Sequence, residues 1–319
     1  MVERTKPERR GDLTGRLGGV LSVVQTPFDD EDRIDAAAHR RQIDWLFDQG
    51  TDGVVTGMVS EVLRLASDER DELASLTCEA AAGRGPVIVS VGAESTAVAV
   101  RHARHAARAG ADAVMAVPPA LTAVDDDALF GYFSTIAAAA GLPVVVQDAS
   151  GYVGRSLSID LQARLFWELG DQALFKPESP PIGPKVTALL EATDGGARIF
   201  EGTGGLFLID SYHRGAIGTM PAGDLVWAMS ALWRALRAGD DDRAYAIGGS
   251  LALVITLQSS LDTFVSIEKH NLVRQGVLPS ARMRGPVGAI GDRHTLAEVD
   301  RLVDRLRGVV GLERLPPAA

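Results

Sequence analysis

The sequence contains a single cysteine, Cys78, among its 319 residues. One thiol cannot form an intramolecular disulfide, and such sparse use of cysteine is typical of proteins from a reducing cytoplasm. Cys78 falls within a predicted helix, where a buried cysteine ordinarily serves as a small apolar side chain. We therefore expect a cytoplasmic protein that is not held together by disulfides.

Several other features are missing. No apolar stretch is long enough to span a membrane. The formal net charge is -10 and there is no long cluster of basic residues, so nucleic acid is not an expected partner. Residues 1–16 lack the long apolar region of a secretory signal, and we expect them to form a mobile N-terminal extension. Neither a membrane nor nucleic acid is therefore an expected partner.

Short apolar segments alternate with amphipathic segments about eight times between residues 17 and 239. The predicted strands cover 19–26, 53–56, 86–91, 113–117, 143–147, 173–176, 197–201 and 218–220. Strands that are apolar throughout are typical of parallel strands buried on both faces. Ser67, Ser95 and Asp125 stand where N-caps of the intervening helices are expected. The pattern predicts an α/β fold, a (β/α)8 TIM barrel, in which the eighth strand is inferred from spacing.

From residue 240 onward the pattern is only helical. Amphipathic segments cover about 243–257, 261–274 and 296–306, with the breakers Leu278-Pro279 and Gly285-Pro286 between the last two. The sequence thus predicts a barrel over 17–239 and a C-terminal helical appendage over 240–319. We expect no catalytic cluster in the appendage.

Lys176 ends the sixth predicted strand, and catalytic residues of such barrels lie at the carboxyl ends of the strands. Burial favours the neutral amine, which is a nucleophile toward carbonyl carbons. The more ordinary alternative is that Lys176 forms an ion pair with Glu178. The other positions expected at this mouth are Val59, Ser60, Glu61, Gln147, Tyr152, Gly202 and Met220.

Motifs for a metal or a cofactor are weak or missing at this mouth. The six histidines fall on helices or distant loops, without the spacing of a metal site. The Gly-rich turn 202–205 precedes a predicted helix and could hold a phosphate, but such turns are usually only tight connections. We therefore expect neither a metal nor a cofactor.

Several motifs, taken in order, resemble the dihydrodipicolinate synthase and N-acetylneuraminate lyase family over about residues 17–310. They are Thr26-Pro27-Phe28, Gly57-Met58-Val59-Ser60-Glu61, Ala109-Gly110-Ala111-Asp112, Val117-Pro118-Pro119, Leu142-Pro143-Val144-Val145-Val146, Phe175-Lys176 and Gly215-Ala216-Ile217-Gly218. The resemblance implies that Lys176 is a Schiff-base lysine. It also implies that the backbone N–H groups of Val59 and Ser60, with the Ser60 hydroxyl, bind a substrate carboxylate. Family members act on pyruvate or other 2-keto acids, usually as homotetramers or homodimers.

The chain also departs from the family pattern. Gln147 replaces the proton-relay tyrosine, Ala120-Leu121 replaces a tyrosine pair, Met58 and Val59 replace two threonines, and Tyr152 replaces an arginine. An amide cannot act as a general base near neutral pH. Proton transfer must then involve a water or the substrate carboxylate, with Glu61 or Tyr152 as further candidates. This implies a divergent member rather than dihydrodipicolinate synthase itself.

The function expected from these residues is that of a Schiff-base-forming, class I lyase acting on pyruvate or another 2-keto acid. Aldolase-type cleavage or condensation of a C–C bond is the first expectation, with Lys176, Gln147 and Tyr152 as catalytic candidates. Two alternatives remain open at this point. One is a dehydratase of a 3-deoxy-2-keto sugar acid, and the other is a keto-acid-binding barrel that has lost turnover.

Overall fold

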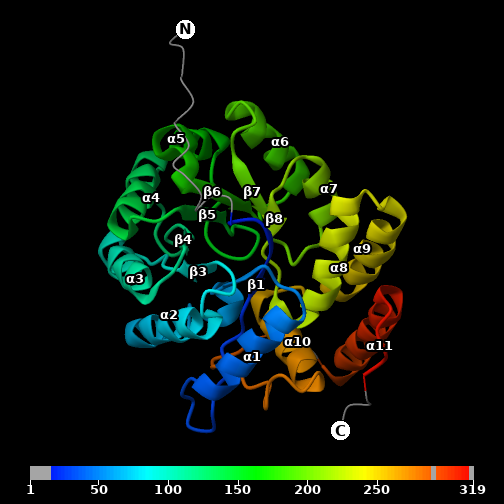
Figure 1. Ribbon diagram of the computed structural model, residues 1–319. Helices are drawn as coiled ribbons and strands as arrows, with labels where there is room; N and C mark the ends of the chain where they lie inside the picture. Colours follow the sequence, from blue (N-terminus) through cyan, green and yellow to red (C-terminus); the bar gives the residue numbers. More distant parts are fainter. Residues whose placement is uncertain (1–15, 289–291, 316–319) are drawn as a thin grey trace.

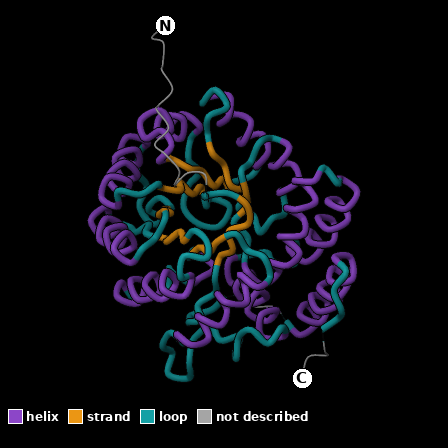
Figure 2. The backbone as a smooth tube through the Cα atoms, in the orientation of Figure 1, coloured by secondary structure: helices purple, strands orange, loops and turns teal. Residues whose placement is uncertain are grey.

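The computed structural model describes residues 16–288 and 292–315. Eight parallel strands form a closed barrel in sequence order, surrounded by helices (Figures 1 and 2). The strands are β1 (Gly19–Val23), β2 (Gly53–Val55), β3 (Val87–Ser90), β4 (Ala113–Ala116), β5 (Val144–Asp148), β6 (Ala173–Pro177), β7 (Arg198–Glu201) and β8 (Gly218–Thr219). The predicted TIM barrel is confirmed, although several strands end one to three residues before their predicted ends.

The barrel closes between β8 and β1, where Gly19 pairs with Gly218 and Val20 with Thr219. A Cβ atom added to Gly218 would lie 2.2 Å from the carbonyl oxygen of Gly19. Only glycine fits this close approach of two backbones, which explains why the eighth strand carries almost no apolar signal.

Helices alternate with the strands around the barrel. They are α1 (Ala36–Asp48), α2 (Ser67–Ala81), α3 (Thr96–Ala109), α4 (Asp126–Ala140), α5 (Ile159–Leu169), α6 (Ile182–Ala192), α7 (Leu208–His213) and α8 (Val226–Ala238), with 3-10 turns η1 (Met58–Ser60), η2 (Gly170–Gln172) and η3 (Gly223–Leu225). The predicted N-caps Ser95 and Asp125 accept N–H groups of Val98 and Ala128. Ser67 is instead the first helical residue, because the Glu69 carboxylate accepts the Ala66 N–H at 2.8 Å and places the cap one residue earlier.

Two apolar layers explain why the strands are apolar on both faces. Leu21, Ile88, Met115, Leu174 and Phe200 belong to a cluster contributed by strands around the whole ring, as expected for the barrel interior. A larger cluster packs the alternate strand residues against the surrounding helices. Because both faces are covered, alternation with polar residues disappears from the strand sequences.

The C-terminal segment forms α9 (Asp241–Ile255), α10 (Leu261–Arg274) and α11 (Arg293–Val310). Helices α9 and α11 pack together on α8 (Figure 1). Helix α10 instead contacts η1, which follows the carboxyl end of β2. The predicted extension at 1–16 lies, except for Arg16, outside the described residues. Among the helices that are described, none is long and apolar enough to cross a membrane.

A buried histidine joins α1 to α2. The Nε2 atom of His39 lies 2.9 Å from the Thr77 hydroxyl, and its Nδ1 atom has no hydrogen-bond partner among the described residues. Burial disfavours the imidazolium and lowers the pKa of His39 from 6.5 to about 4. Between about pH 4 and pH 6.5, His39 is protonated in the unfolded chain but neutral in the folded protein. Lowering the pH through this range therefore favours unfolding.

We predict that His39 makes the protein less stable as the pH falls below about 6.5. Between pH 7.5 and pH 5, the wild type should lose about 2 kcal/mol more unfolding free energy than the His39→Gln variant, which cannot titrate at this position. Urea unfolding at the two pH values measures the difference. Equal losses in both proteins would contradict the assignment.

Candidate active site

One cavity opens at the carboxyl ends of the strands and encloses about 40 Å³ of solvent space. Its lining comes from β1, η1, β5 and β6, from the loops that follow β5, β6, β7 and β8, and from α10. The lining residues are Val23, Gly57, Met58, Val59, Gln147, Tyr152, Lys176, Glu178, Gly202, Gly204, Met220, Ala222, Leu261, Phe264 and Glu268. Six predicted site residues, Lys176, Gln147, Tyr152, Val59, Gly202 and Met220, are therefore brought together.

Lys176 and Glu178 face the cavity side by side. They are two residues apart on an extended backbone, so their side chains point to the same face. The Glu178 N–H donates to the Asp148 carbonyl at 2.9 Å, which extends the β5–β6 ladder one residue past Pro177. The Lys176 Nζ atom lies 3.3 Å from Glu178 Oε1, and both residues are only 4% exposed. The ion pair that the sequence allowed thus exists, and it lies inside the cavity.

Gln147 holds the other oxygen of the same carboxylate. Residue 147 on β5 pairs in register with Lys176 on β6, and its Nε2 donates to Glu178 Oε2 at 2.5 Å. Burial raises the pKa of Glu178, although the Lys176 ammonium and the Gln147 amide oppose this effect. A carboxyl group with a raised pKa is a stronger base when ionised than an ordinary glutamate.

Tyr152 closes the cavity from the loop after β5. Its ring packs edge-to-face on Phe264 of α10, with ring centroids 5.7 Å apart. Burial raises the pKa of the Tyr152 phenol, and the nearby carboxylates of Glu178, Glu201 and Glu268 raise it further. Tyr152 therefore stays a neutral phenol at ordinary pH, able to donate a hydrogen bond but not to act as a phenolate base.

The Ser60 side chain and backbone N–H do not fit the carboxylate-binding role expected from the sequence. The Ser60 hydroxyl donates to the Val24 carbonyl and accepts the Gly57 N–H at 3.0 Å, and the Ser60 N–H donates to the Gly57 carbonyl. Ser60 is fully buried and is absent from the cavity lining. Its polar groups are used to shape the loop, because a short hydroxyl side chain bonds readily to nearby backbone.

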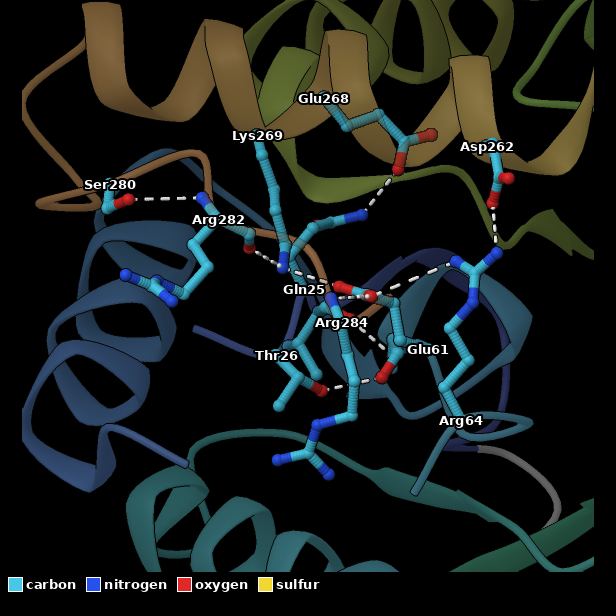
Figure 3. A network of polar contacts seen from close by, with 12 residues as sticks. Gln25, Thr26, Glu61, Arg64, Asp262, Glu268, Lys269, Ser280, Arg282 and Arg284 are labelled. Atoms are coloured by element: carbon cyan, nitrogen blue, oxygen red, sulfur yellow. Dashed lines mark hydrogen bonds and ion pairs between the residues drawn. The ribbon is translucent and has the colours of Figure 1, made fainter. Parts of the chain in front are cut away.

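Glu61 is likewise absent from the lining and belongs to a second polar network (Figure 3). Its carboxylate lies 2.5 Å from Lys269 Nζ of α10 and accepts the Arg284 N–H at 2.8 Å. Neither member of the Glu61–Lys269 pair has an exposed side chain. Burial lowers the pKa of Lys269, and the charge of Glu61 opposes that shift. The network fastens α10 to the loop after β2, and Glu61 has no access to the cavity.

The Gly-rich turn after β7 is already occupied by a carboxylate of the protein. Glu201 Oε1 accepts the N–H groups of Thr203 and Phe207 at 3.0 and 3.4 Å, and Glu201 Oε2 accepts the Thr219 hydroxyl at 2.9 Å. A phosphate would have to displace this buried group. Within the described part of the chain, no group of three or more His, Cys, Asp or Glu side chains could hold a metal ion.

Comparison with known proteins decides the family. The model of the dihydrodipicolinate synthetase family matches residues 16–305. The chain belongs to this family. An L-2-keto-3-deoxyarabonate dehydratase from Azospirillum brasilense is 32% identical over 303 residues, covering 92% of this chain and 96% of the relative.

Solved structures agree with this dihydrodipicolinate synthetase family assignment. A dihydrodipicolinate synthase from Rhodopseudomonas palustris is 28% identical, with a TM-score of 0.82 and coverage of 91% of this chain and 98% of that one. A sialic acid aldolase from Ruminococcus gnavus shares the fold at 21% identity, with a TM-score of 0.83 and coverage of 92% of this chain and 99% of that one. The predicted family and the predicted enzyme class, a lyase, are confirmed.

Helix α10 contributes residues to the cavity that were not predicted from the sequence. Leu261, Phe264 and Glu268 line it, although no site residue was expected after residue 239. They lie three and four residues apart on one helix face. A glutamate at helical spacing from two apolar residues was the sequence feature that could have indicated a contribution of this helix to the cavity. Glu178 was considered only as an ion-pair partner, yet its position two residues after Lys176 already placed it on the same strand face.

Gly202 sets the space available to Lys176 and Glu178. A Cβ atom at this position would lie 2.6 Å from Lys176 Cε and 2.6 Å from Glu178 Cγ. Both side chains would have to move, and a displacement of about 1 Å in a catalytic group can reduce activity about 100-fold.

We therefore predict that Gly202→Ala lowers kcat/KM for the keto-acid substrate at least about tenfold while the protein remains folded. The matched control is Gly131→Ala in α4, where an added Cβ has nothing within 4 Å. Steady-state kinetics and thermal unfolding of both variants provide the measurement. A Gly202→Ala enzyme as active as the wild type would show that Gly202 does not confine the Lys176 and Glu178 side chains.

Proposed function

We propose that this protein is a class I dehydratase of a 2-keto-3-deoxy sugar acid, in which Lys176 forms the Schiff base. The observation that carries the proposal is the buried Glu178 carboxylate, 3.3 Å from the Lys176 amine and held by Gln147. The similarity to a 2-keto-3-deoxyarabonate dehydratase over almost the whole chain supports the same reaction.

In the first step Glu178 takes a proton from the Lys176 ammonium, and the free amine attacks the 2-keto carbon. The carbinolamine hydroxyl then takes this proton back from Glu178 and leaves as water, which forms an iminium ion and leaves Glu178 ionised. The substrate carboxylate would be bound by the backbone N–H groups of Met58 and Val59. Both residues line the cavity, and neither N–H donates to a backbone carbonyl among the described hydrogen bonds. Backbone donors can bind an anion whichever side chains they carry, so the loss of the two threonines does not remove this function.

In the second step the ionised Glu178 removes a proton from C3, the carbon next to the iminium carbon. The electrons of the C3–H bond move into the iminium and give an enamine. The enamine then expels the C4 hydroxyl, which takes the proton from Glu178 and leaves as water. Hydrolysis of the resulting unsaturated iminium releases the dehydrated keto acid and returns Lys176 as the ammonium paired with Glu178.

The position of the carboxylate favours this elimination over cleavage of the C3–C4 bond, the first expectation from the sequence. Cleavage requires a base at the C4 hydroxyl. In the resemblance described above, the tyrosine relay would supply this base, and here Gln147 and Ala120-Leu121 stand in place of its tyrosines. Elimination requires a base at C3, and C3 is attached to the carbon that binds Nζ. A carboxylate beside Nζ is therefore suited to the C3 proton.

The proposal is tested by incubating the protein with pyruvate or a 2-keto-3-deoxy pentonate, reducing with borohydride and mapping the adduct by mass spectrometry. We expect the adduct on Lys176 and none on Lys269, an equally buried lysine that is held by Glu61 and the Arg282 carbonyl. The Lys176→Arg variant should form no adduct. The matched control is Lys185→Arg, at a lysine of α6 that is absent from the cavity lining. Release of pyruvate and an aldehyde instead of a dehydrated product would favour the aldolase.

We further predict that Glu178→Gln separates Schiff-base formation from proton transfer. The variant should still be trapped on Lys176, but exchange of the pyruvate methyl protons with deuterium should fall at least about 100-fold, the usual contribution of a general base. In the wild type, exchange should decline as the pH falls through the pKa of Glu178, which burial raises above 4.5. NMR follows the exchange, and an unchanged rate in the variant would exclude Glu178 as the base.

Two further expectations, the cellular location and the oligomeric state, belong to the same proposal. We infer a cytoplasmic location, supported by the single thiol, Cys78, whose pKa is raised to about 12 by burial so that it is not a reactive thiolate. We also infer a homotetramer or homodimer. Leu121 supports this, because it is 88% exposed on the loop after β4. Light scattering on the purified protein gives the oligomeric state directly.

A further inference from the structure

Glu268 is the one carboxyl group that α10 contributes to the cavity lining. It shares a helix face with Leu261 and Phe264, and it is only 1% exposed. The mechanism proposed above does not use it. A buried carboxyl group on an apolar helix face destabilises the fold unless it has a partner, so its presence in a ligand cavity requires an explanation.

Gln25 fixes the orientation of this carboxyl group. The Gln25 Nε2 atom donates a hydrogen bond to Glu268 Oε2 (Figure 3). Gln25 is itself held by Gln42, which accepts the Gln25 N–H at 2.8 Å and donates to the Gln25 carbonyl at 2.9 Å. No described residue forms a hydrogen bond with the second oxygen, Glu268 Oε1. One oxygen is thus held by the protein and the other remains available.

The environment of Glu268 disfavours its ionised form. Burial raises its pKa well above 4.5, and the neighbouring carboxylate of Asp224 raises it further, against the weaker influence of Gln25 and Lys269. Because Gln25 donates to Oε2, Oε1 is the oxygen left for a ligand. A hydroxyl group both donates and accepts, so it can form a hydrogen bond with Oε1 whether the carboxyl group is ionised or neutral.

We propose that Glu268 determines substrate specificity by binding a hydroxyl group of the substrate chain beyond C4, far from the 2-keto group. Lys176 holds C2 from β6, and α10 bounds the same cavity from the neighbourhood of η1. In this proposal the carboxylate lies at η1, and the polyhydroxy chain extends from C2 in the other direction. It follows α10, which also contacts η3, so that the hydroxyl beyond C4 meets Glu268. This inference rests on the proposed function, because it assumes that Lys176 binds the 2-keto group.

The chemistry predicts which substrates are accepted. A site built to hydrogen-bond a hydroxyl discriminates strongly against the analogue that lacks it, since the buried polar group is then left without its partner. A 2-keto acid with hydroxyls at C4 and C5 should therefore be preferred over the same acid without the C5 hydroxyl. A role confined to holding Gln25 in place would affect both substrates equally.

The test compares kcat/KM for 4,5-dihydroxy-2-oxopentanoate and 4-hydroxy-2-oxopentanoate in the wild type, Glu268→Gln and Glu268→Leu. The ratio between substrates cancels any general loss of activity or folding. We expect the wild type to prefer the dihydroxy acid at least about tenfold. Glu268→Gln keeps a donor and an acceptor and should retain most of the preference. Glu268→Leu should reduce it to less than about threefold, mainly through a higher KM for the dihydroxy acid.

Two results would overturn the assignment of Glu268 alone. One is a wild type that treats both acids alike, and the other is a Glu268→Leu variant that keeps the full preference. In either case borohydride would still trap both acids on Lys176, so the proposed function would stand. If wild-type Lys176 formed no adduct with either acid, the proposed function and this inference would both be overturned.

Discussion

The parallel register between β5 and β6 is the constraint on which the site depends. It places Gln147 beside Lys176, and the ladder continues to Glu178 through the Asp148 carbonyl. A shift of one residue in either strand would turn one of these side chains out of the cavity. The amine, carboxylate and amide are therefore arranged by backbone hydrogen bonds and not by flexible loops. This gives the buried charges the fixed geometry that they need to be stable.

Replacing a phenol by an amide at position 147 changes what the neighbouring residue can do. A phenol can pass a proton, whereas the Gln147 amide can only orient and hold. Its hydrogen bond fixes Glu178 next to Lys176, and burial makes that carboxyl more basic when ionised. The apparent loss of the relay is thus compensated on the adjacent strand, two residues from the nucleophile. In the proposed mechanism the family's amine chemistry is retained, while proton transfer moves to Glu178.

The sequence predicts the barrel and Lys176 because these depend on local patterns. Apolar runs, helix caps and helix breakers can be recognised within short segments of sequence. The observed strand ends differ from the predicted ones by only a few residues. The role of Ser60 could not be predicted, because its hydroxyl bonds to Val24, which the fold brings to it from another strand. Glu268 was missed for a similar reason. Its place in the cavity depends on where α10 docks, and no periodicity specifies that docking.

Docking of α10 depends on Glu61 and Lys269, two buried charges 208 residues apart in the chain. Removing one partner of such a pair costs about 3–5 kcal/mol, since the other charge is left buried alone. This has a consequence during synthesis on the ribosome. When the last barrel strand has emerged, Glu61 still lacks its cation and the cavity lacks one wall. The nascent enzyme therefore cannot complete its substrate pocket until α10, which ends at Arg274, has been translated.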